Sequence, residues 1–103
     1  MSGSQAHAWL QSELTVQSAD GLHARPAIKV ARLARKYAAT IQIRVAGDDV
    51  WVDAKSVARL MSLRADEGKV IELRASGDDA GAAIDGLGGF FARDFTEADE
   101  GAG

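Results

Sequence analysis

Residues 21–27, with the sequence GLHARPA, hold the side chains most suited to chemistry. His23 is one of only two histidines, Arg25 follows two residues later, and Pro26 is the only proline. Proline is favoured in the first turn of a helix, so we expect a helix to begin beside His23. Helix N-termini bind phosphate through unpaired amides and the helix dipole, and the Arg25 guanidinium suits phosphoryl oxygens. The stretch therefore predicts a phosphate-binding histidine.

The same surroundings act on the imidazole of His23. A helix N-terminus and a nearby guanidinium both disfavour a second positive charge, so we expect His23 to be neutral and nucleophilic at neutral pH. A histidine at a helix start can also be a simple polar cap, and the residue types alone leave both interpretations open.

The rest of the sequence lacks the machinery of a complete enzyme. It has no GxxxxGK[ST] phosphate loop and no carboxylates paired for acid–base work. Zero cysteines and two unpaired histidines predict no metal site, and we expect no cofactor. If His23 carries a phosphoryl group, other proteins must supply it and remove it.

Composition predicts one globular domain in a chain of 103 residues, 47% of them hydrophobic and 26% charged. No apolar run could span a bilayer, there is no signal peptide, and the absence of cysteine fits the cytoplasm. A net charge of −3 and the lack of aromatics among the basic residues argue against nucleic-acid binding. Residues 21–45 contain six basic side chains and no acidic one, which indicates either an anionic partner or a solvated helix face.

Two hydrophobic periodicities alternate along the chain and predict the elements that position His23. The expected strands are residues 13–18, 41–45, 50–54 and 70–73, and the expected helices are residues 24–37, 56–63 and 79–95. Residues 1–12 and 96–103 are expected to be flexible tails around a domain of residues 13–95. Ser56 is a predicted N-cap. Gly81, Gly86, Gly88 and Gly89 weaken the last helix, which must then depend on tertiary packing.

The order β-α-β-β-α-β-α predicts an α+β fold, an open-faced β-sandwich. It would have a four-stranded, mainly antiparallel sheet with all three helices on one face. Trp51 should point onto the open face, either as a lone exposed aromatic or as a binding platform.

GLHARPA, the basic helix after it, and the later stretches AKSVARLMSL and EGKVIELRASG resemble the HPr family, the histidine phosphocarriers of the bacterial phosphotransferase system. The resemblance covers residues 13–95. It implies that His23 takes a phosphoryl group from enzyme I on Nδ1 and donates it to an enzyme IIA-type acceptor. It also implies that Arg25 neutralises the phosphate and that the Ala24 and Arg25 amides bind it. Such a protein is a transfer intermediate in sugar uptake rather than an enzyme.

The resemblance further implies regulation and partner docking. Ser56 corresponds to the serine that HPr kinase/phosphorylase modifies in some bacteria, although it could also be only an N-cap. Partners would dock on the first and second helices, and the chain is expected to be a monomer. The predicted docking residues are Ile28, Arg32, Arg35, Val57, Ala58, Arg59 and Met61.

Other functions stay open at this point. The carrier could serve a nitrogen-related branch or a phosphotransferase-linked dihydroxyacetone kinase. A regulatory binding protein controlled by Ser56 is another alternative, which the presence of His23 and Arg25 argues against.

Overall fold

Four antiparallel strands form a single sheet. The computed structural model describes residues 8–17, 19 and 21–95. The strands are β1 (Leu10–Thr15), β2 (Thr40–Val45), β3 (Val52–Asp53) and β4 (Val70–Ser76). Their order across the sheet is β1-β4-β2-β3, and every neighbouring pair is antiparallel. The predicted order of elements is confirmed.

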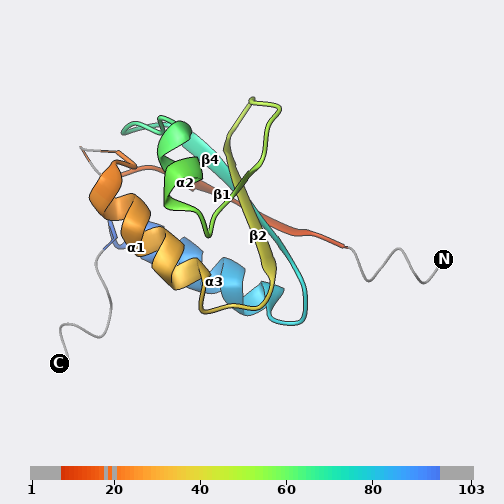
Figure 1. Cartoon of the computed structure of the whole chain (residues 1–103). Coiled ribbons are helices and arrows are strands. Elements are labelled where there is room, and N and C mark those ends of the chain that lie inside the picture. The colour runs from red at the N-terminus through yellow and green to blue at the C-terminus, as the bar shows by residue number, and fades with distance from the viewer. Residues whose placement is uncertain (1–7, 18, 20, 96–103) are drawn as a thin grey trace, which may run out of the picture.

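Three helices cover one face of the sheet (Figure 1). They are α1 (Ala24–Ala34), α2 (Val57–Ser62) and α3 (Ala80–Ala92). Side chains alternate along the two central strands, so Ile41, Ile43, Ile71 and Leu73 are buried beneath the helices. α3 lies against β1 and β4, while α1 contacts both other helices. The predicted open-faced sandwich is thus confirmed.

The first strand begins earlier than its hydrophobic pattern predicts. It starts at Leu10 rather than residue 13, because β4 extends to Ser76 and offers Ala75 as a partner for Leu10. Residues 10–12, predicted as part of a tail, therefore belong to the sheet. The strand also ends at Thr15, before the predicted residue 18, because Val16 and Gln17 lie outside the sheet. Residues 1–7 and 96–103, the remainder of the predicted tails, lie outside the described residues, as does Ser18.

The other predicted elements that shorten most in the structure are α1, β3 and α3. α1 ends at Ala34 rather than residue 37, because the amides of Lys36 and Tyr37 donate to carbonyls three residues back and tighten the chain into a turn. β3 contains only two residues, since pairing with β2 is limited to Val52 and Asp53. α3 ends at Ala92, short of the predicted residue 95.

One glycine of α3 is closely approached by a side chain from the segment after α1. A Cβ at Gly86 would overlap the hydroxyl of Tyr37, which follows α1. At Gly81 and Gly88 a Cβ would make only ordinary contacts, 3.9 Å from Leu10 and 3.7 Å from Leu14. Gly86 therefore allows the end of α1 to approach α3, at a cost of about 1 kcal/mol in helix propensity.

The uncovered face of the sheet carries two tryptophans alternating with two arginines, which we call the tryptophan–arginine stack. The Arg74 guanidinium carbon lies 4.2 Å from the ring centroid of Trp9 and 4.1 Å from that of Trp51. The Arg44 guanidinium carbon also lies 4.4 Å from the ring centroid of Trp51. Trp51 thus lies on the open face as predicted, but it contacts two guanidinium groups rather than being isolated.

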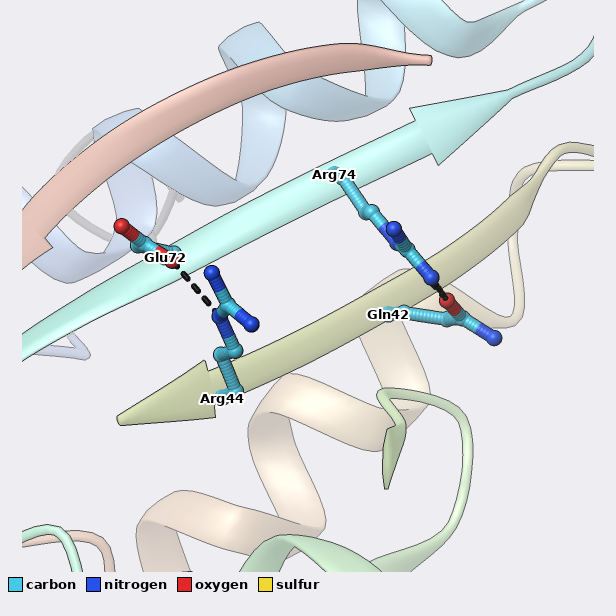
Figure 2. Close-up of polar contacts among 4 residues, drawn as sticks. All are labelled: Gln42, Arg44, Glu72 and Arg74. Atoms are coloured by element: carbon cyan, nitrogen blue, oxygen red, sulfur yellow. Dashed lines mark hydrogen bonds and ion pairs between the residues drawn. The ribbon is translucent and has the colours of Figure 1, made fainter. Parts of the chain in front are cut away.

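Neighbouring strands hold both arginines of the stack (Figure 2). Arg44 Nε contacts Glu72 Oε1 at 2.6 Å, and Arg74 donates from Nε and Nη2 to Gln42 Oε1 at 2.8 and 2.6 Å. Desolvation, followed by the charge of Arg44, lowers the pKa of Arg74 below its ordinary value. Each of these cations therefore has a partner within the protein.

Candidate functional site

His23 occupies the N-cap position of α1. Its backbone is extended, with φ −83° and ψ −167°, and its carbonyl accepts the first helical hydrogen bond from the Ala27 amide at 2.9 Å. The imidazole makes no capping hydrogen bond and is exposed. The polar-cap interpretation of His23 is therefore wrong in its simple form, because the side chain does not cap the helix.

The first turn of α1 has free donors and no negative charge. Pro26 has no N–H, and no described residue accepts a hydrogen bond from the Ala24 or Arg25 amide. The turn contains no acidic residue, and the exposed Arg25 side chain has no hydrogen bond or ion pair with another described residue. Two amides, a helix dipole and a guanidinium are therefore available to an anion beside His23.

A second loop is fixed against the His23 segment. The amide of Leu22 donates to the carbonyl of Ala65 at 2.9 Å, and Leu22 itself is buried. Gly21 has a positive φ of 67°, and a Cβ there would lie 2.8 Å from Ala65 O and 3.0 Å from the Cα of Asp66. Because only glycine fits both the conformation and the space, Gly21 allows the loop after α2 to approach His23.

The two loops and α2 enclose an open hollow of about 470 Å³, which we call the His23 hollow. It is lined by Leu22, His23, Met61, Ser62, Arg64, Ala65 and Asp66. The sequence analysis placed His23 and Met61 in functional roles but missed Arg64 and Asp66. Their stretch reads only as a charged turn after a short helix, and no spacing rule connects it to a residue some forty positions earlier.

Ser56 caps α2, as predicted. Its Oγ accepts a hydrogen bond from the Arg59 amide at 3.2 Å, and the residue is half-buried. The preceding residue ties this end of α2 to the end of α1. Lys55 Nζ donates to the carbonyl of Tyr37 at 2.7 Å, and the Lys55 carbonyl accepts from Arg35 Nε at 2.9 Å.

The structure brings most of the predicted docking residues to the surface of α1 and α2, which pack on each other. Ile28 and Met61 are large apolar side chains, and each is 44% exposed. Arg32, Ala58 and Arg59 are exposed as well. Val57 differs because it is half-buried and packs against the core. Arg35 is exposed, but its Nε is already used by the bond to Lys55.

Within residues 8–17, 19 and 21–95, no three histidine, aspartate or glutamate side chains cluster as metal ligands would. No helix in this part of the chain has the length and apolar character needed to cross a membrane.

Comparisons with known proteins agree with this geometry. The family described as "PTS HPr component phosphorylation site" matches residues 10–93. The phosphocarrier protein HPr of Haloferax volcanii is 40% identical over 78 residues, covering 76% of this chain and 88% of that protein. The phosphocarrier protein NPr of Shewanella violacea is 39% identical over 89 residues, covering 86% of this chain and 96% of that protein.

A solved structure shows the same fold. HPr-C-His from Thermoanaerobacter tengcongensis matches with a TM-score of 0.79 and 34% identity, covering 85% of this chain and 97% of that chain. The family match spans the sheet, the three helices and both loops of the His23 hollow. The chain belongs to the HPr family, the phosphocarrier proteins of the phosphotransferase system.

Proposed function

We propose that His23 is the residue that carries the phosphoryl group, received from enzyme I and passed to an enzyme IIA-type acceptor. The observation that carries this proposal is the exposed imidazole at the N-terminus of α1, which makes no capping hydrogen bond and lies beside two free amides and Arg25. A side chain engaged in capping the helix could not approach a donor protein, whereas this one can.

The transfer needs no reagent beyond the two proteins. A lone pair of the His23 imidazole, at Nδ1 in the family, attacks the phosphorus of the phosphohistidine on enzyme I. The donor P–N bond breaks, and the donor imidazole keeps its electron pair. The Ala24 and Arg25 amides and the Arg25 guanidinium stabilise the phosphoryl oxygens as charge builds up on them. Donation to the acceptor is the same exchange in reverse, so the chain acts as a carrier rather than a complete enzyme.

The docking surface for both partners would be the exposed side of α1 and α2. Ile28 and Met61 supply apolar contact area, and Arg32 and Arg59 surround it with positive charge. This combination suits transient complexes with acidic partners, because complementary charge speeds encounter without requiring high affinity. A cysteine-free chain suits the reducing cytoplasm, where we place this carrier.

Ser56 is proposed as a second, regulatory phosphorylation site. The residue is half-buried and its hydroxyl caps α2 through the Arg59 amide, so a phosphoryl group there would lie at the N-terminus of α2, next to the Lys55 contacts with the end of α1. HPr kinase/phosphorylase with ATP should give acid-stable phosphate on the wild type and none on Ser56→Ala. Ser62→Ala, at the other serine of α2, should be labelled as the wild type is.

The experiment for His23 uses the purified full chain with enzyme I and phosphoenolpyruvate. We expect phosphate that is labile in acid and stable in base, and none on His23→Ala. The matched control is His7→Ala, which removes the only other histidine of the sequence and should be labelled as the wild type is. Absence of label on the wild type, or equal label on His23→Ala, would overturn the proposal.

A second candidate function is a carrier in a nitrogen-related branch, which the similarity to NPr of Shewanella violacea supports. The phosphorylated chain should be offered separately to a sugar-specific enzyme IIA and to its nitrogen-related counterpart. Faster loss of phosphate to the second acceptor would favour this branch.

A further inference from the structure

We infer that Arg64 is a second phosphoryl-binding residue, which contacts the phosphate on His23 from the loop that follows α2. This inference rests on the proposed role of His23. His23 and Arg64 come from different loops and line the same hollow of about 470 Å³. Arg25 belongs to α1 and does not line it. The two arginines thus differ in their position around the imidazole.

The backbone at Arg64 is held in an unusual conformation. Its φ is +52°, in the left-handed region that residues with a Cβ seldom adopt. The loop is fixed there by neighbouring contacts: Ala65 O accepts from Leu22, and the Arg64 amide donates to Met61 O at 3.3 Å. None of these contacts uses the arginine side chain. Glycine or asparagine would fit the conformation better, so the fold itself does not explain an arginine at this position.

The Arg64 side chain is available to a ligand. It is exposed, and it makes no hydrogen bond or ion pair with any other residue that the structure describes. Asp66 lines the same hollow, but the two side chains form no ion pair. A guanidinium near an exposed histidine, with no described partner, is well suited to bind phosphoryl oxygens in a bidentate manner.

The negative charge of Asp66 explains why a positive charge is useful at Arg64. A phosphoryl group adds about two negative charges, and a carboxylate on the same hollow would repel it. Arg64 lies two residues from Asp66 and offsets this repulsion. The effect acts between exposed groups, so it should be strong at low ionic strength and weaker when salt screens the charges.

Arg64→Gly tests this inference because it separates fold from function. Glycine relieves the positive φ, so the variant should unfold at the same temperature as the wild type or higher. Its kcat/KM with phospho-enzyme I should fall about tenfold at low salt, as expected for a lost hydrogen bond to a charged group. Arg64→Lys restores the charge but not the bidentate geometry, so it should recover only part of the rate. Arg64→Asn, which also tolerates the backbone conformation, should match Arg64→Gly.

The matched control is Lys69→Ala. Lys69 is an exposed cation close to the same loop, but it does not line the His23 hollow, so its loss should leave the rate within about twofold of the wild type. A spectroscopic measurement adds independent evidence. The Nε–Hε resonance of Arg64 should shift when His23 is phosphorylated, while that of Arg44, held by Glu72 in the tryptophan–arginine stack, should not.

Two failures are distinguishable. Wild-type protein that takes no phosphate from enzyme I overturns the proposed function, and this inference with it. Wild type that is phosphorylated, with Arg64→Gly transferring at the same rate and an unchanged Arg64 resonance, overturns the inference about Arg64 alone.

Discussion

The arginines on the open face of the sheet and those around His23 differ in whether the protein supplies them with interaction partners. On the open face of the sheet, Arg44 and Arg74 are stacked against tryptophan rings and hydrogen-bonded to Glu72 and Gln42. Around His23, Arg25 and Arg64 have no such partner among the described residues. The first pair is used to hold strands together, and the second pair is left available to a ligand. The presence of an arginine therefore does not by itself indicate function. An arginine that the fold leaves without a partner is the better indicator of a ligand site.

The largest effect should follow from Arg25→Ala. Removing this guanidinium should lower kcat/KM for phosphoryl transfer about 100-fold, since a donor to the transferring group is lost. Because Arg25 is exposed and has no described partner, the free energy of unfolding should change by less than about 0.5 kcal/mol. Steady-state transfer assays and urea denaturation check both numbers. A large loss of stability would show that Arg25 is structural, and would remove the contrast with the sheet.

Arg74→Met should show the reverse pattern. It removes two hydrogen bonds to Gln42 and the cation between two tryptophan rings, which should lower the free energy of unfolding by about 2 kcal/mol. Transfer rates measured well below the unfolding transition should equal those of the wild type. If transfer fell as much as it does in Arg25→Ala, the open face would have to be part of the site.

The smallest effect should come from Asp79→Asn, because the Asp79 carboxylate, like Arg44 and Arg74, already has hydrogen-bond partners within the protein. Asp79 accepts from the amides of Ala38 and Ala39 at 2.8 Å each, and asparagine has one acceptor oxygen instead of two. Chiefly the hydrogen bond from Ala38 lowers the pKa of the carboxyl in the folded state, against the opposing effect of desolvation. At pH 7 the variant should melt about 3 °C below the wild type, with unchanged transfer.

The stabilisation by Asp79 should decrease as the pH falls. Because the folded pKa of Asp79 lies below its ordinary value of 3.8, the stabilisation is fully present above that pH and is lost as pH falls through the folded pKa. Melting curves of the wild type and Asp79→Asn should therefore converge in acid. A gap that stays constant down to the most acidic measurable pH would contradict the ionic origin of the effect.

The sequence predicts the layers of this fold better than the ends of its elements. Ile41, Ile43, Ile71 and Leu73 alternate with polar residues, which is enough to place two strands and the buried face. β1 shows why the ends fail: Leu10 is exposed on an edge strand, so no burial pattern marks it, and only pairing with β4 makes it a strand. Gly86 is explained only by the position of Tyr37, which lies 49 residues earlier in the chain.

The candidate site divides in the same way. His23, Arg25 and Ser56 could be found because each has a local signature, a helix start or an N-cap. Arg64 could not, because its place on the His23 hollow depends on long-range contacts such as the hydrogen bond between Leu22 and Ala65. Its positive φ is not one that its residue type favours.

The uncapped N-terminus of α1 has a consequence for the carrier itself. Among the residues that the structure describes, no side chain caps the helix at His23, and the first turn contains no acidic residue to complement its dipole. If His23 carries the phosphoryl group, that group supplies the negative charge which most helices obtain from an encoded serine or aspartate. Phosphorylation would then stabilise the N-terminus of α1, and the phosphorylated carrier would have the higher free energy of unfolding. Passing the phosphoryl group to an acceptor would then remove this stabilising charge from α1.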